Sequence, residues 1–199
     1  YHGDLHTGNM MVTDKKLCIY DFGLVCTFHT DEDKNIAYNY YMSLMNKDWE
    51  EASNWACDLV PTSSTDVVVP DVTNQPSISS TVSLASLIVN SDADITISSG
   101  SITVSGTSDI DGDLSIASSA VFDADGAFDA TGGSVTFTGS GRLQMSNTVT
   151  SLGTFTRSTG TVEYDGGSQT VLGMSASSGS SYYNLEIDGT GTKTMAATS

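Results

Sequence analysis

Most of this chain, from residue 62 to residue 199, consists of short segments in which apolar and polar residues alternate. The segments are LIV at 87, ITI at 95, ITV at 102, LSI at 114, VTF at 135, LQM at 143, VEY at 162 and LEI at 185. Alternation with a period of two predicts strands with one buried face, and the Gly, Ser, Asp and Asn that bound each segment predict tight turns. Because helix-forming residues are nearly absent here, the pattern excludes a helical domain.

The segments recur along the chain. GSVTFTG at 133 and GTVEYDG at 160 repeat one phrase 27 residues apart, and the segments at 87 and 114 are also 27 residues apart. A period of roughly 20 to 30 residues with two or three strands predicts a β-solenoid, in which each coil buries its inward side chains by stacking on its neighbours. An antiparallel sandwich fits the strand spacing equally well. The predicted fold class is mainly β, a parallel β-helix-like solenoid preceded by a small α+β segment.

Composition divides the chain near Pro61. All three cysteines, all three histidines and both tryptophans precede this residue, and the rest is dense in Ser, Thr, Gly and Asp. We therefore expect two domains, 1–61 and 62–199. The net charge of −17 and the seven scattered Lys and Arg residues exclude nucleic acid and anionic membranes as partners. No apolar run approaches the roughly 18 residues of a membrane span.

Residues 1–61 contain a pattern of polar groups around a predicted hairpin. The apolar run LCIY at 17–20 is followed by Asp21, which predicts a buried strand with a carboxylate at its end. NMMV at 9–12 and KLCIYD at 16–21 flank the polar turn TDKK, which predicts a hairpin that brings Asn9 near Asp21. A carboxylate and an amide oxygen placed together suit Mg²⁺ bound with substrate phosphates.

The sequence HGDLHTGN at 2–9, followed by DFG at 21–23, resembles the catalytic and metal loops of UbiB-family atypical kinases, and next the aminoglycoside phosphotransferases. The resemblance implies Mg-ATP as cofactor and the carboxyl-terminal lobe of a kinase as fold. By this resemblance Asp4 positions or deprotonates the acceptor hydroxyl and is the catalytic residue. Asn9 and Asp21 are the metal and cofactor ligands, with Asp21 bridging Mg²⁺ to the nucleotide phosphates.

The sequence departs from the kinase family in one respect. A working phosphotransferase also has a nucleotide loop, a phosphate-binding lysine and the glutamate partner of that lysine. In the family these precede the catalytic loop, where this sequence has only Tyr1. We therefore expect the chain as given not to turn over ATP.

Apolar residues at three- and four-residue steps predict amphipathic helix over 33–59, with a second helix beginning near Trp49 behind an Asp48–Glu51 capping box.

The second segment resembles the secreted repeat regions of Bacteroidetes-type bacterial surface proteins. The similar phrases are VPTSSTDVVVPDVTNQPSISSTVSLASLIVNSDADITISSGSITVSG and GTVEYDGGSQTVLG. This resemblance implies an extracellular or cell-surface location and a structural or adhesive role toward an unidentified surface or adhesion ligand. The kinase-like segment implies the cytoplasm or an organelle instead. The conflict predicts a chimera or a fragment, with its junction between residues 46 and 64.

One acidic cluster in the second segment has chemical interest. Asp109, Asp111 and Asp113 have the alternate spacing of a calcium loop, but Leu114 and Ala120 replace its glycine and its terminal acid. The cluster is therefore not an EF-hand. Two interpretations stay open: a weak Ca²⁺ site on one face of a coil, which would make a calcium-dependent binding module, or a solvated acidic turn.

Overall fold

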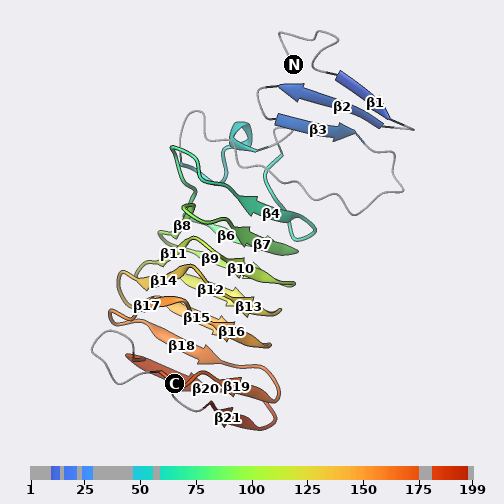
Figure 1. Cartoon of the computed structure of the whole chain (residues 1–199). Coiled ribbons are helices and arrows are strands. Elements are labelled where there is room, and N and C mark those ends of the chain that lie inside the picture. Colours follow the sequence, from blue (N-terminus) through green and yellow to red (C-terminus); the bar gives the residue numbers. More distant parts are fainter. Residues whose placement is uncertain are drawn as a thin grey trace.

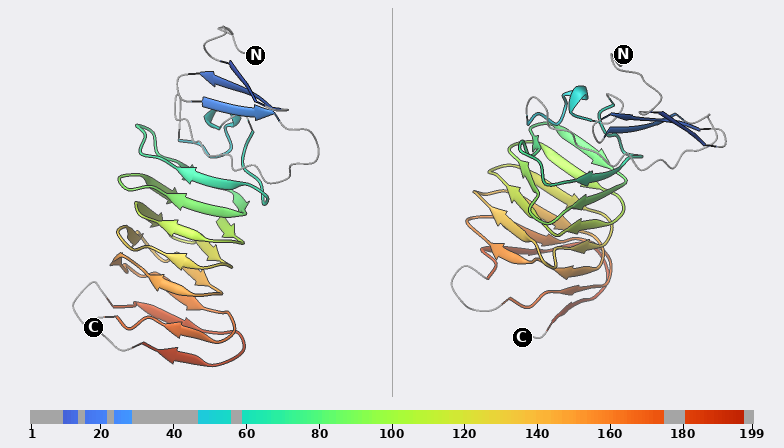
Figure 2. Two further views of the ribbon diagram at one scale, coloured as in Figure 1. Left: turned by 45° about the vertical axis from the view of Figure 1, so that its right-hand side comes forward. Right: turned by 45° about the horizontal axis from the view of Figure 1, so that its top comes forward.

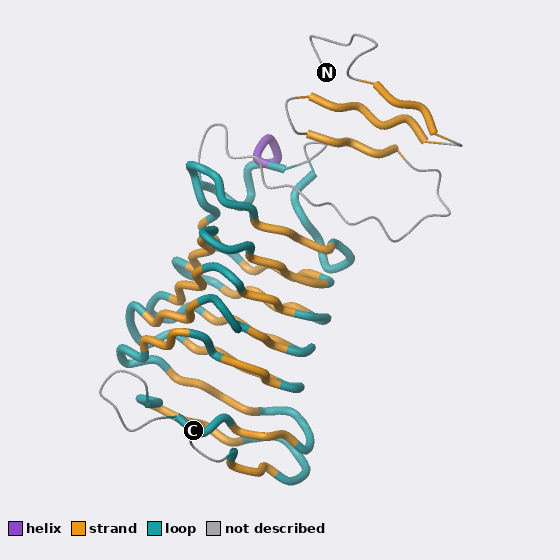
Figure 3. Tube along the Cα trace, viewed as in Figure 1, coloured by secondary structure: helices purple, strands orange, loops and turns teal. Residues whose placement is uncertain are grey.

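The computed structural model describes residues 10–13, 16–21, 24–28, 47–55, 59–174 and 181–196. Residues 59–174 and 181–196 form a parallel β-solenoid whose coils stack along one axis, as Figure 1 shows. The same stack is seen from two further sides in Figure 2. Almost all regular structure here is strand, and Figure 3 shows the short loops that join the strands at each corner. The predicted mainly β solenoid is confirmed.

Between Asp66 and Tyr164, each coil contributes one strand to each of three sheets. The first sheet contains β4 (Asp66–Val69), β7 (Ser86–Val89), β10 (Ser108–Ile110), β13 (Phe128–Asp129) and β16 (Val149–Ser151). The second contains β5 (Ser77–Ile78), β8 (Asp94–Ile97), β11 (Asp113–Ile116), β14 (Ser134–Phe137) and β17 (Thr154–Thr156). The third contains β6 (Thr81–Leu84), β9 (Ser101–Val104), β12 (Val121–Ala124), β15 (Arg142–Met145), β18 (Thr161–Tyr164) and β20 (Asn184–Ile187). A last pair joins β19 (Gln169–Val171) to β21 (Lys193–Met195).

The strand pairing decides between the two folds that the sequence left open. Neighbouring strands in the solenoid run parallel, which excludes the antiparallel sandwich. Leu87 pairs with Ser108, and Ser108 pairs with Phe128, so one coil takes 21 and then 20 residues. The 27-residue phrase repeat is therefore not the coil. The two copies of the phrase fall on β14 in the second sheet and β18 in the third sheet. The strand one coil after β14 is β17, and β18 is the next strand along the chain.

Alternate side chains of the strands fill the interior. In the third sheet, for example, Ile102 and Phe122 point inward with no exposed surface. Phe122 packs edge to face on Phe128 with ring centroids 5.8 Å apart, and both rings are fully buried. Burying each such side chain stabilises the fold by about 1.5–3 kcal/mol. Of the two neighbouring tyrosines near the end of the chain, Tyr182 packs against the core, whereas Tyr183 is 55% exposed.

Residues 47–55 close the first coil instead of forming the predicted helix. Asp48 makes a parallel bridge with Ser77, and the Ser77 amide donates to the Lys47 carbonyl at 2.7 Å. The only helical turn in this stretch is the 3-10 turn Ala52–Asn54. The helix prediction is wrong here because the apolar side chains are used differently: Trp49 and Trp55 are buried against the solenoid. We call residues 47–55 the cap.

Tight stacking at the corners requires small residues. A Cβ placed on Gly126 would lie 1.9 Å from the carbonyl oxygen of Gly106 in the preceding coil. Real Cβ atoms do not approach backbone so closely, so a larger residue would force the coils apart. The glycines that the sequence shows at the turns therefore set the coil spacing as well as the turn conformation.

The kinase-like segment contributes an antiparallel sheet of β1 (Met10–Thr13), β2 (Lys16–Asp21) and β3 (Leu24–Phe28). The pairing of β1 with β2 confirms the predicted hairpin. An α+β kinase lobe is not confirmed, and residues 33–46 and 56–58 of the predicted helix lie outside the described residues. Within the described ranges, no helix has the length and apolar character that crossing a membrane requires.

Candidate functional site

The predicted phosphotransferase site lies largely outside the described residues. Asp4 and Asn9 lie outside the described residues. Asp21 is the last residue of β2 and pairs with Leu24 of β3, so its backbone ends a strand, as the sequence predicts. The roles of Asp4, Asn9 and Asp21, and the binding of Mg-ATP, therefore stay predictions.

The predicted calcium residues are distributed around a corner. Asp109 lies on β10 in the first sheet, whereas Asp113 begins β11 in the second sheet, and Asp111 lies in the turn between them. Burial raises the pKa of the Asp109 carboxyl, and the neighbouring charges of Asp111 and Asp129 raise it further. Asp129 is the partner of Asp109 in the next coil. The carboxylates of Asp111, on the same coil, and of Asp129, on the next coil, both repel that of Asp109.

Asp113 has its own neighbours on the second sheet. It stacks on Asp94 of the preceding coil and accepts a hydrogen bond from the Ser134 hydroxyl of the next coil. Burial raises the pKa of Asp94, with a further contribution from the charge of Asp113. Across the part of the chain that the structure describes, no group of three or more His, Cys, Asp or Glu residues has a metal-binding arrangement. Calcium binding by the three aspartates stays a prediction.

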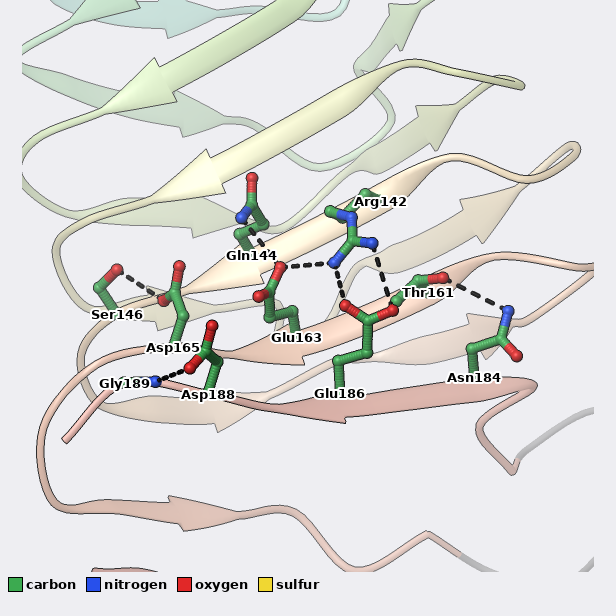
Figure 4. A network of polar contacts seen from close by, with 10 residues as sticks. All are labelled: Arg142, Gln144, Ser146, Thr161, Glu163, Asp165, Asn184, Glu186, Asp188 and Gly189. Carbon is green, nitrogen blue, oxygen red and sulfur yellow. Dashed lines mark hydrogen bonds and ion pairs between the residues drawn. The ribbon is translucent and has the colours of Figure 1, made fainter. Parts of the chain in front are cut away.

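The most developed polar cluster lies on the outer face of the third sheet (Figure 4). Arg142 on β15 donates from Nη1 to Glu163 Oε2 on β18 at 2.6 Å, and it also pairs with Glu186 on β20. Gln144 donates to the same Glu163 oxygen at 2.9 Å. The hydrogen bond from Arg142 lowers the pKa of Glu186. One guanidinium therefore links three successive coils. Sequence reasoning missed this cluster, although the outward positions of RLQM, VEY and LEI carried the signal.

The outward positions of Thr103, Asp123, Gln144 and Glu163 are register partners and form a polar column that continues this cluster, with Ser146 and Asp165 beside it. The Ser146 hydroxyl donates to Asp165 Oδ1 at 2.7 Å, and Thr103 donates to Asp123 Oδ2 at 3.4 Å (Figure 4 shows the first pair). Burial raises the pKa of Asp123, followed by the charges of Asp125 and Asp165. These contacts pair side chains of adjacent coils with one another. These hydroxyls and carboxylates hydrogen-bond to one another across coils, so they stabilise the outer surface of the solenoid.

The second sheet has a shallow hollow on its outer face. Its lining is polar and includes Ser77, Asp94, Thr96, Asp113, Ser115 and Thr136. Thr96 pairs with Ser115, and Ser115 pairs with Thr136, so hydroxyl groups repeat at the spacing of the coils. Such a face is well solvated. It offers rows of hydrogen-bonding groups, without an apolar pocket to enclose a small ligand.

Comparison with known proteins gives two family matches. A family model described as "Domain of unknown function (DUF8693)" matches residues 40–155, and the model of the ABC1 atypical kinase-like domain matches residues 1–56. The second match confirms that the first segment resembles the atypical kinases. Neither the curated proteins nor the solved structures contain a match. The first match begins before the cap and extends into β17, so it covers the cap together with most of the stacked coils.

Proposed function

This chain belongs to the DUF8693 family, whose model covers more than half of it, and from this premise we propose that its solenoid is a structural or adhesive module of an extracellular surface protein. The kinase-like segment is carried as a second, non-catalytic part. The combination of an ABC1-like segment with a solenoid is compatible with a chimera. The proposed cellular location is the cell surface, and the proposed partner is a surface or adhesion ligand.

The continuous stacking of the coils carries the proposal. Inward residues in consecutive coils, such as Leu114, Val135 and Phe155, pair in register along the second sheet. Each coil thereby buries the apolar face of the previous one, and the backbone ladders run along the whole stack. A stack of this kind resists bending and extension. Its outer faces are polar and internally paired, as expected for a spacer exposed to water.

Single-molecule pulling of the full chain tests the structural role. With handles fused to both ends, a spacer should unfold in discrete steps, because each coil is held by its neighbour. One coil of roughly 20 residues releases about 70 Å of chain at about 3.5 Å per residue. We expect steps of this size or multiples of it. A smooth extension without steps would show that the coils bear no load, and the structural role would be wrong.

Surface display tests the adhesive role. The full chain would be exported and anchored on a bacterial cell, beside a Leu114→Asp variant whose buried charge disrupts a central coil. We expect cells with the parent chain to attach to immobilised polysaccharide or protein more than cells with the variant. Equal attachment at equal display levels would leave the spacer role alone.

A phosphotransferase is the alternative function, and the ABC1 match at residues 1–56 favours it. In that function Asp21 would hold Mg²⁺ at the nucleotide phosphates. Calorimetry of the full chain with Mg-ATP separates the two functions. We expect no binding at micromolar nucleotide. Micromolar affinity that Asp21→Ala removes would establish the alternative instead.

A further inference from the structure

Four strands of the solenoid are followed directly by an aspartate and a glycine. An Asp–Gly pair is a place where a polypeptide can modify itself, because the glycine amide nitrogen can attack the side-chain carboxyl carbon of the aspartate and close a succinimide ring. Glycine has no Cβ that would hinder this attack. The four pairs are Asp111–Gly112, Asp125–Gly126, Asp165–Gly166 and Asp188–Gly189.

The two reacting groups of the last pair are already in contact. The Gly189 amide donates to Asp188 Oδ1 at 2.7 Å, as Figure 4 shows. The carboxyl carbon that would be attacked is bonded to this oxygen, so it lies beside the amide nitrogen. Holding two reacting groups together in this way supplies much of the rate of an intramolecular reaction.

The other pairs hold the same groups differently. The Gly112 amide donates to the Val89 carbonyl of the preceding coil at 3.1 Å. The Gly166 amide donates to Gln169 Oε1 at 2.9 Å, and Asp165 Oδ1 accepts from the Ser146 hydroxyl at 2.7 Å. Among the described residues of the four pairs, an aspartate carboxylate accepts from the amide of its following glycine at Asp188 alone.

A lysine contacts the peptide group that would react. The Lys193 ammonium on β21 donates to the main-chain carbonyl of Asp188 at 2.8 Å, and it also donates to the carbonyls of Gly166 and Gly167 at 2.9 Å. The Asp188 carbonyl and the Gly189 amide belong to one peptide group. A cation on its oxygen therefore makes the amide proton easier to remove, because it stabilises the negative charge that forms on that oxygen.

We propose that Asp188–Gly189 is a self-modification site at which the chain forms a succinimide and then an isoaspartate, with Lys193 activating the reacting peptide group. The Gly189 nitrogen bonds to the carbon of the neutral Asp188 carboxyl group. The carboxyl hydroxyl then leaves with the amide proton as one molecule of water. The step is a condensation without any change of oxidation state. This inference goes beyond the proposed function and does not depend on it.

Opening of the ring by water gives one of two products. Attack at the side-chain carbonyl restores aspartate, whereas attack at the main-chain carbonyl of Asp188 gives isoaspartate. Lys193 contacts the oxygen of the main-chain carbonyl, so it would stabilise the negative charge of that attack and favour isoaspartate. The main chain of an isoaspartate runs through the side-chain methylene, so the link between β20 and β21 gains one carbon atom.

A time course of the full chain at neutral pH and physiological temperature, followed by peptide mass spectrometry, tests the proposal. Succinimide is detected as the loss of one water, and electron-transfer fragmentation distinguishes isoaspartate from aspartate. We expect Asp188 to be modified about fivefold faster or more than Asp111 and Asp165, whose glycine amides must first break a hydrogen bond. Modification at Asp125 should also be slower than at Asp188.

Three variants of the full chain test the roles of the two side chains. Asp188→Glu keeps the carboxylate but would have to close a larger ring, so modification at this position should disappear. Lys193→Met should slow the reaction at Asp188 and lower the share of isoaspartate, which is measured in heavy-oxygen water because that labels both products. Lys47→Met is the matched control, since it removes one positive charge at the opposite end of the solenoid and should change neither quantity.

Several results would overturn the proposal. These are an unmodified Asp188, equal rates at the four pairs, or faster modification at any of the other three. An unchanged rate and product ratio in Lys193→Met, or an equal change in Lys47→Met, would refute the role of Lys193. The comparison of the four pairs is made within the parent chain, so it decides even if Lys193→Met fails to fold.

Discussion

The ring of Trp49 packs edge to face on the ring of Trp55, with centroids 4.5 Å apart. The Trp55 Nε1 donates to the Trp49 carbonyl at 2.7 Å, so the two residues hold one another through backbone as well as rings. These are both of the tryptophans in the chain. Intrinsic tryptophan fluorescence therefore reports the state of the cap alone, and circular dichroism reports the coils.

Removing one ring of this pair should open the first coil. Trp49→Ala deletes a fully buried side chain, for which we expect a loss of about 3–5 kcal/mol in the free energy of unfolding. Denaturant titration followed by fluorescence of the remaining Trp55 measures it. Leu59→Ala is the control, because Leu59 is 58% exposed and should change stability little. Equal, small effects of both substitutions would show that the cap does not hold the first coil.

Adding one methyl group at a corner should also destabilise the stack. Gly126→Ala would push a Cβ into the Gly106 carbonyl, and we expect a loss of about 1–3 kcal/mol or more because backbone cannot move aside easily. Gly167→Ala is the matched control, since a Cβ there meets nothing within 4 Å. Thermal unfolding by circular dichroism compares them. A stable Gly126→Ala protein would contradict the coil spacing.

A closed set of hydrogen bonds fixes the start of the last coil. The phenolic oxygens of Tyr164 and Tyr182 are 3.1 Å apart, the Leu172 amide donates to Tyr164, and Tyr182 donates to the Leu172 carbonyl at 3.0 Å. Tyr182→Phe removes two of these bonds, so we expect a loss of about 1–3 kcal/mol by chemical denaturation. The exposed Tyr183→Phe should have no effect. A neutral Tyr182→Phe would mean that these bonds do not order the coil.

Asp123 should make stability depend on pH. Burial and the charges of Asp125 and Asp165 raise its pKa in the folded state, so the folded chain keeps this proton more readily than the unfolded chain does. Its contribution to stability is therefore greatest in acid and declines as pH rises from the ordinary value of 3.8 through the raised folded pKa. We expect Asp123→Asn to raise the melting temperature at neutral pH, with a gain that shrinks toward pH 3.8.

Asp66→Asn supplies the comparison for that experiment. Asp66 lies on the first sheet and accepts a hydrogen bond from Ser86 at 2.6 Å, an interaction that an asparagine oxygen can retain. The Asp66→Asn substitution removes one negative charge but leaves the charge repulsion around Asp123 unchanged. A gain of the same size and pH dependence in both variants would assign the effect to net charge rather than to the column.

The period of two in the sequence was enough to predict the strands and their inward faces. Segments such as ITI at 95 and VTF at 135 place their apolar residues inward, and Ile95, Ile97 and Val135 are fully buried. The coil length was harder to read, because β14 and β18 carry similar phrases in different sheets. Side-chain period identifies a strand but does not say which sheet it joins.

Contacts between distant coils could not be read from the sequence. Trp49 lies within a pattern with helical spacing, and only its packing against the first coil shows that it belongs to the cap. Arg142 and Glu186 are 44 residues apart in sequence and meet because they lie two coil steps apart on the same sheet, with only β18 between their strands. Conversely, Asp109 and Asp113 are close in sequence but lie on different sheets, on either side of a corner. In a solenoid, residues one coil length apart in sequence lie side by side, whereas residues of a short sequence motif can fall on different sheets.

Amide hydrogen exchange of the full chain, measured by mass spectrometry, tests most directly that stacked parallel coils hold this protein together. Strand amides between residues 81 and 164 bond to neighbouring coils, so we expect slow exchange throughout this range, at rates set by cooperative opening. Peptides that contain the buried faces of β9, β12 and β15 should be among the slowest. Fast exchange across residues 81–164 under native conditions would contradict the account.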